Sequence, residues 1–102
     1  MNFEWDEQKN QANIRSHDLD FFDAWEIFEG PVLDLPDSRY DYGEDRIVGI
    51  GILRNLIVAV VFVEKYGDTI RIISLRRALK HERNRFLKYI QNQLGTSGGD
   101  DR

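Results

Sequence analysis

Residues 47–64 have the sequence IVGIGILRNLIVAVVFVE, two apolar runs separated by the polar pair Arg54-Asn55. Each run has the length of a strand, and a two-residue link between strands is typical of a β-hairpin, which pairs them antiparallel. A membrane helix would need about 20 mostly apolar residues without such a break. The stretch therefore predicts two antiparallel strands, 47–53 and 56–64.

Further strands are expected on both sides of this hairpin. A turn around Gly67 leads into an isoleucine-rich strand over 69–76, and so short a turn again implies antiparallel pairing. A strand over 32–35 ends at Pro36, and a polar loop over 37–45 follows it. In strand 69–76, simple alternation places two sets of side chains on opposite faces: Ile70, Ile72, Ser74 and Arg76 on one, and Arg71, Ile73, Leu75 and Arg77 on the other.

Helices are expected nearer the two ends of the chain. A short first strand around residues 3–5 precedes a helix that Asp6 caps and that runs to about His17. A second helix begins after Asp20 and stops at Gly30, and its apolar stripe consists of Phe21, Trp25 and Phe28. A last helix spans 80–94, with an apolar face made by Phe86, Leu87, Ile90 and Leu94.

These elements predict an α+β protein with the order β-α-α-β-β-β-β-α. The sheet is expected to be antiparallel, with the two N-terminal helices and the C-terminal helix packed against it. The length of 102 residues suits one domain, which we place at residues 1–94. The last residues, GTSGGDDR, predict a flexible tail over 95–102.

The charge of the chain is distributed unevenly. Net charge is −4, yet residues 71–89 hold seven basic side chains against the single acid Glu82. Residues 1–70 hold 6 basic and 15 acidic side chains. Since the local field decides where a phosphate binds, the 71–89 segment is a candidate nucleic-acid surface. The alternative is a basic helix face that only contacts solvent.

Several kinds of site are disfavoured by the residue types. The chain has no cysteine, which removes disulfides and thiolate chemistry, and its two histidines lack metal-site spacing. The GIG at 49–51 lies inside a predicted strand and lacks the third glycine of a nucleotide-binding loop. No signal peptide opens the chain, because Asn2, Glu4 and Asp6 interrupt it. We therefore expect no metal, no cofactor and no membrane association, and a cytoplasmic protein.

Three groups of polar residues are candidates for chemistry. Lys9, Asn13 and His17 recur every four residues and so share one helix face. Arg76 ends an apolar strand face, where it could hold a phosphate or form an ion pair with Glu82. His81 precedes Arg85 by one helical turn and could titrate near neutral pH, or simply lie on the surface.

Four motifs in order resemble the BrnT toxin family. The first is F-E-W-D-x-x-K-x-x-x-N-x-x-x-H over residues 3–17, and the second is Phe21, Ala24 and Phe28 followed by Pro31. The third is Arg46-Ile47-Val48 with Ile50-Gly51, and the fourth is I-R-I-I-S-x-R-x-A over 70–78, then Glu82-Arg83 and a tyrosine. Asp18 departs from the family's usual glycine after the histidine, the Arg54-Asn55 turn is shorter than many relatives show, and Tyr89 lies later than the family's tyrosine.

This resemblance implies a RelE-like fold and a metal-independent ribonuclease that acts as the toxin of a type II toxin–antitoxin pair. The implied partners are a BrnA-like antitoxin and an RNA substrate, with operator DNA reached only through the antitoxin. We expect Arg76 to stabilise the charged phosphorane, with Lys9 and Arg46 assisting. His17 is the first choice for moving a proton and His81 the second. Six residues are expected to bind RNA: Arg71, Arg77, Lys80, His81, Arg83 and Arg85.

Two other functions remain open. One is a non-catalytic toxin-fold module that binds an antitoxin or RNA. The other is a plain RNA-binding domain, which is disfavoured because aromatic residues do not alternate with the basic ones on a strand. Cleavage of purified RNA in EDTA separates the enzyme from both.

Overall fold

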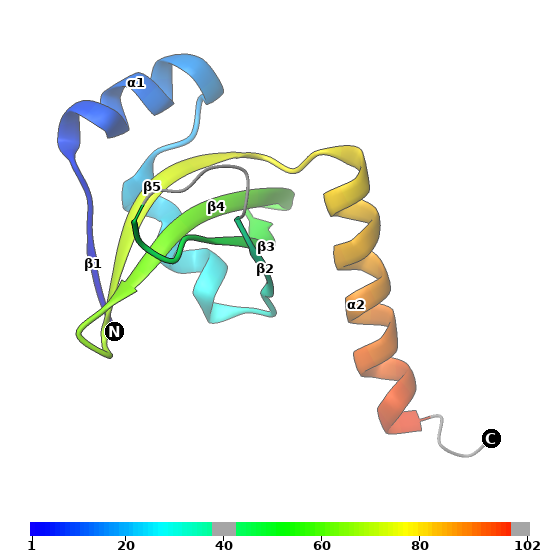
Figure 1. The fold of residues 1–102 in the computed structure, drawn as a ribbon. Coiled ribbons are helices and arrows are strands. Elements are labelled where there is room, and N and C mark those ends of the chain that lie inside the picture. The colour runs from blue at the N-terminus through cyan, green and yellow to red at the C-terminus, as the bar shows by residue number, and fades with distance from the viewer. Residues whose placement is uncertain (38–42, 99–102) are drawn as a thin grey trace.

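The computed structural model describes residues 1–37 and 43–98 (Figure 1). Within them the chain forms a sheet in the strand order β1-β5-β4-β3-β2. The strands are β1 (Asn2–Glu4), β2 (Leu33–Pro36), β3 (Ile47–Leu53), β4 (Leu56–Lys65) and β5 (Thr69–Arg77). The helices are α1 (Glu7–His17), the 3-10 helix η1 (Phe21–Glu29) and α2 (Lys80–Gly98). This element order is the expected one, and the α+β class is confirmed.

The central hairpin is confirmed as predicted. Strands β3 and β4 pair antiparallel, with Leu53 opposite Leu56 across the turn. Arg54 and Asn55 have φ angles of 52° and 68°. Positive φ at both central residues is the geometry of the hairpin turn whose twist matches that of the strands. The local sequence was sufficient here because the turn itself sets the pairing.

The prediction of a wholly antiparallel sheet was wrong at one edge. β1 pairs with β5 in parallel, with Asn2 opposite Thr69 and Glu4 opposite Arg71. All of α1, η1 and β2–β4 lie between these two strands in the chain. No short turn therefore constrains their direction, and a long crossover permits parallel pairing.

The predicted faces of β5 were also wrong, because a β-bulge interrupts the strand. Phe62 pairs with Ile72, but its neighbour Val61 pairs with Ser74, so Ile73 is an extra residue. A bulge reverses which face the following side chains occupy. Leu75 consequently packs in the same core cluster as Ile70 and Ile72, whereas Ser74 and Arg76 lie on the opposite face.

The two faces of the sheet carry separate cores. One face packs against η1 and the segment before it, with Phe21, Ile27 and Phe62 among its fully buried side chains. The other face packs against α2 through Phe86, which is also fully buried, with Tyr89 and Ile90 beside it. Figure 1 shows η1 and α2 on opposite sides of the sheet.

The predicted stripe of the second helix was confirmed at Phe21 and Phe28 but was wrong at Trp25, because the helix is of the 3-10 type. Its buried residues are Phe21, Ala24 and Ile27, spaced by three, while Trp25 is 47% exposed. A 3-10 helix has three residues per turn, so positions i and i+3 share a face.

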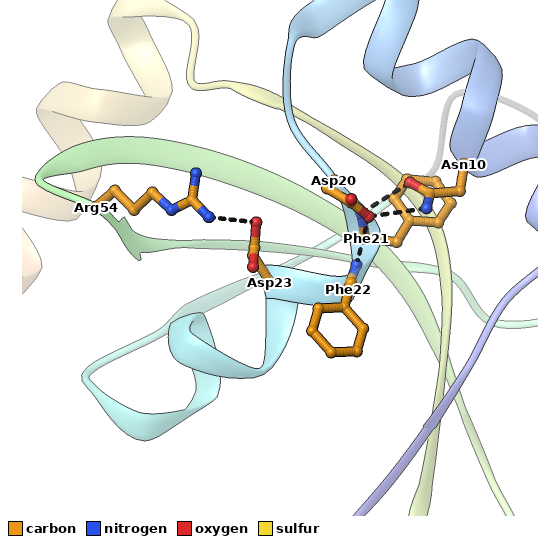
Figure 2. A network of polar contacts seen from close by, with 6 residues as sticks. All are labelled: Asn10, Asp20, Phe21, Phe22, Asp23 and Arg54. Carbon is orange, nitrogen blue, oxygen red and sulfur yellow. Dashed lines mark hydrogen bonds and ion pairs between the residues drawn. The ribbon is translucent and has the colours of Figure 1, made fainter.

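A buried asparagine, Asn10, joins α1 to the start of η1 (Figure 2). The Asn10 amide donates to Asp20 Oδ1 at 2.9 Å, and its oxygen accepts the Phe21 N–H at 2.8 Å. Asp20 also accepts the Phe22 N–H and so caps η1. The hydrogen bonds from the Asn10 side chain and the Phe22 N–H lower the pKa of Asp20, and together they outweigh burial, which raises it. This network sets the orientation of α1.

Helix α2 is longer than predicted and leads away from the sheet. It continues to Gly98, four residues past the expected end at Leu94. Figure 1 shows its C-terminal half running beyond the strands, and the side chain of Leu94 is 70% exposed. Of the predicted tail, residues 99–102 lie outside the described residues, as do residues 38–42 of the predicted polar loop.

Candidate functional site

A groove of about 470 Å³ lies between the start of α2 and strands β2 and β3. We call it the α2 groove. Nine residues line it: Leu35, Pro36, Asp37, Val48, Arg76, Leu79, His81, Glu82 and Arg85. The bulge in β5 turns Arg76 toward this face, and the α2 helix contributes His81 and Arg85 one turn apart. Three of the predicted site residues are thus brought together.

Arg76 is held in the groove by a two-point ion pair with Glu82. Its Nη1 donates to Glu82 Oε1 at 2.8 Å and its Nη2 donates to Oε2 at 3.0 Å. The side chains of Arg76 and Glu82 are 20% and 8% exposed. The ion pair that the sequence left as an alternative therefore exists, and it fixes the plane of the guanidinium.

Glu82 also caps α2. Its Oε1 accepts the N–H of Leu79, the residue that precedes the helix, at 2.8 Å. Burial raises the pKa of Glu82, but the hydrogen bonds from Arg76 and Leu79 and the nearby charges of Arg76 and His81 outweigh it, so the pKa is lowered overall. The carboxylate therefore stays charged at neutral pH and ties Arg76 to the helix start.

The α1 face lies on a different surface. Lys9, Asn13 and His17 line a shallow pocket together with Ile73 of β5, as their four-residue spacing predicts. Asn13 is not available for chemistry there, because its amide bonds both the N–H and the C=O of Leu75. Lys9 and His17 are exposed beside it. Ile73 and Arg76 are three residues apart on β5, and none of the residues that line the α1 pocket lines the α2 groove.

The remaining predicted residues are dispersed. Arg46 bonds Glu44 at 3.0 Å, and its C=O accepts the N–H of Asp37, which lines the groove. Arg71 is paired with Glu4 at 3.2 Å, across the β1–β5 edge. Arg77 is exposed and opposite Val58, on the face away from the groove. Lys80 and Arg83 are exposed on α2, and neither lines the groove.

Sequence reasoning missed the acidic side of the groove. Asp37 follows β2 directly and faces the same space as Arg76 and His81. Its position in a run of polar residues gave no signal, because its neighbours in space come from β5 and α2. Among the described residues, the groove included, no three histidine or acidic side chains gather as a metal site would require. No helix there is long and apolar enough to span a membrane.

Comparison with known proteins bears directly on this arrangement. Residues 5–82 match the family model described as the ribonuclease toxin, BrnT, of type II toxin–antitoxin systems. The chain belongs to the BrnT family. A crystal structure of the Brucella abortus ribonuclease toxin BrnT is similar, with 34% sequence identity and a TM-score of 0.64, and the match covers 78% of this chain and 99% of that one. Among curated proteins, none matches the chain.

Membership in the BrnT family makes this protein a ribonuclease toxin of the type II class, which implies RNA as target and a protein antitoxin as partner. The family match includes α1, Arg76 and Glu82, and it ends at Glu82. His81 is therefore inside it, whereas Arg85 and the rest of α2 lie outside. Asp18, where the resemblance led us to expect glycine, has a φ of 58° and ends α1 in the left-handed conformation that glycine adopts most easily.

Proposed function

We propose that this toxin cleaves RNA without a metal ion, and that the scissile phosphate binds in the α2 groove. The observation that carries the proposal is the convergence of Arg76, His81 and Arg85 on one groove. The 2′-hydroxyl of RNA is a built-in nucleophile, so the protein needs only to move protons and to stabilise the phosphorane.

The proposed reaction is an internal transfer. The 2′-oxygen bonds to phosphorus as its proton leaves to a base, and the P–O5′ bond breaks as that oxygen takes up a proton. The products are a 2′,3′-cyclic phosphate and a 5′-hydroxyl. No oxidant or second substrate is required.

Arg76 is proposed to stabilise the phosphorane. A guanidinium has five N–H donors, and the contacts to Glu82 and to the Arg77 C=O use three of them. Two donors remain for phosphate oxygens, on a plane that Glu82 already holds. Arg85 adds positive charge beside it, and Lys80 and Arg83 strengthen the local field.

His81 is the proton-transfer residue that the geometry now favours. It lines the same groove as Arg76, whereas His17 lies with Lys9 in the separate α1 pocket. His17, Lys9 and Arg46 then bind RNA outside the cleavage point. This order reverses the preference that the sequence alone suggested.

The wider biology follows the family. We propose a RelE-like fold, inhibition of translation by mRNA cleavage in the cytoplasm, and neutralisation by a BrnA-like antitoxin that covers the groove. Operator DNA would be reached only through that antitoxin. Complementary charge between an acidic antitoxin segment and the basic start of α2 would speed its capture.

The test is cleavage of purified RNA in EDTA, with product ends identified by mass spectrometry. Arg76→Lys and His81→Ala should each lower the rate about 10²–10⁴-fold, with melting curves recorded for each variant. Arg15→Ala is the control and should cut at the parent rate, because Arg15 is an exposed cation on the side of α1 opposite the stripe of Lys9, Asn13 and His17. Cleavage that requires added metal would refute the mechanism.

The competing function is a non-catalytic toxin-fold protein. The observation in its favour is that buried Glu82 already neutralises Arg76. Such a protein would bind RNA or antitoxin and leave RNA intact, so the same EDTA assay distinguishes it.

A further inference from the structure

Beyond the groove, α2 carries an exposed surface whose charges are all positive. Between Lys80 and Leu94 its single acid is Glu82, which is buried against Arg76. Its cations are exposed: Lys80, Arg83, Arg85 and Lys88. The exposed part of this helix therefore attracts anions and has no acidic side chain to offset them.

These cations divide between two flanks of the helix. At about 100° per residue, His81, Arg85 and Lys88 fall on one flank, and Arg83 falls on the other. His81 and Arg85 line the α2 groove. Lys88 continues their flank one turn beyond Arg85, where the helix leads away from the sheet (Figure 1). The positive charges of Arg85 and Lys88 on this flank thus form a line that leads out of the groove.

The spacing of this line suits a nucleic-acid strand. From His81 to Lys88 the helix rises about 10 Å, which spans about three phosphates of a stacked strand. The BrnT family match ends at Glu82, so Arg85 and Lys88 lie outside the matched part. The fully buried Phe86 anchors this part of α2 on the sheet and keeps the flank in place.

We propose that the His81–Lys88 flank of α2 binds the RNA strand that runs out of the groove, so that this toxin favours substrates with about three or more nucleotides on one side of the cut. The proposal rests on the groove being the cleavage site. It adds a binding surface that acts on affinity and leaves the chemical step unchanged.

The test measures binding of 2′-O-methyl oligouridines, which lack the nucleophile and cannot be cut. Two lengths are compared, a dinucleotide with a single phosphate and an oligomer of about twelve nucleotides, of which only the longer can contact the groove and Lys88 at the same time. Lys88→Ala should weaken binding of the longer probe about threefold and lower its salt slope by about 0.7, the value for one phosphate contact in a single strand. Binding of the shorter probe should not change.

Arg15→Ala is the control, since it removes one exposed positive charge from α1, far from the flank. It should leave both probes unaffected. Equal losses of affinity for the longer probe in Lys88→Ala and Arg15→Ala would mean that only net charge matters. Unchanged affinity in Lys88→Ala would mean that this flank does not bind RNA and is instead a surface for a protein partner. Either result overturns the proposal.

The binding proposal and the cleavage mechanism can be refuted independently of each other. If the parent protein does not cut RNA in EDTA but binding of the longer probe still depends on Lys88, the proposed mechanism is refuted and the role of the flank in binding RNA is retained. If the parent cuts RNA, Lys88→Ala should raise KM for long RNA about threefold at unchanged kcat. A fall in kcat alone would contradict a role in binding.

Discussion

The side chain of Asn13 pairs with the backbone of Leu75 as a neighbouring strand would. Its Nδ2 donates to the Leu75 C=O at 2.8 Å, and its Oδ1 accepts the Leu75 N–H at 3.1 Å. β1 pairs with β5 only over Thr69–Arg71, so beyond it the edge of β5 needs another partner. Asn13 supplies it and fixes α1 beside the strand that carries Arg76.

The first prediction concerns this pairing. Asn13→Asp has the same shape but loses the donor, so a carboxylate would face the Leu75 C=O. We expect the free energy of unfolding to fall by about 2–3 kcal/mol, the cost of a buried polar group left without its bond. Urea unfolding measures it. Gln8→Ala, at an exposed position of the same helix, is the control and should change stability by less than about 0.5 kcal/mol.

Features set by neighbouring residues were predictable from the sequence, and features set across the fold were not. The β3–β4 hairpin followed from its own turn. The bulge at Ile73 did not, because alternation of side chains along β5 gives no sign of an extra residue. Since that residue reverses the face of Arg76, the groove itself could not be placed from the sequence.

The candidate site shows the same division. The α1 stripe of Lys9 and His17 and the helical pair His81 and Arg85 were found because each lies within one helix. The Arg76–Glu82 ion pair was foreseen as an alternative, since only six residues separate the partners. Asp37 was missed because its neighbours in the groove are distant in the chain.

The second prediction concerns the close approach of η1 to β3. A Cβ on Gly51 would lie 2.7 Å from Cγ2 of Ile27, which is fully buried and cannot easily move. Gly51→Ala should therefore cost about 1–3 kcal/mol of stability through overpacking. The matched control is Gly30→Ala, where a Cβ meets nothing within 4 Å. Equal melting temperatures for the two variants would contradict this account.

The third prediction concerns the end of α1. Asp18 has a φ of 58°, a conformation that costs most residues about 1–2 kcal/mol and glycine almost nothing. Asp18→Gly should raise the free energy of unfolding by up to about 1 kcal/mol, because its greater flexibility when unfolded offsets part of the gain. Asp18→Val should lower it by more, since β-branched residues avoid this region. Thermal unfolding of both variants decides, and a stabilising valine would be incompatible with the left-handed end.

The last prediction concerns how acid acts on the Arg76–Glu82 pair. The pKa of Glu82 is lowered below its ordinary 4.5, so its charge stabilises the fold fully above that pH and loses effect as the pH falls through the lowered value. Glu82→Gln should lower the free energy of unfolding by about 2 kcal/mol at neutral pH. The difference in this free energy between variant and parent should become smaller in acid. Urea unfolding from neutral pH to below 4.5 measures that difference.

Combining Arg76→Gln with Glu82→Gln separates the contribution of the ion pair to stability from that of the helix cap. If the two residues act as a pair, the double variant loses less than the sum of the single ones, because neither partner is left buried with an unmatched charge. Two results would show that Glu82 stabilises α2 without holding Arg76. One is a stability difference between Glu82→Gln and the parent that stays constant with pH, and the other is single-variant losses of stability that add in the double variant.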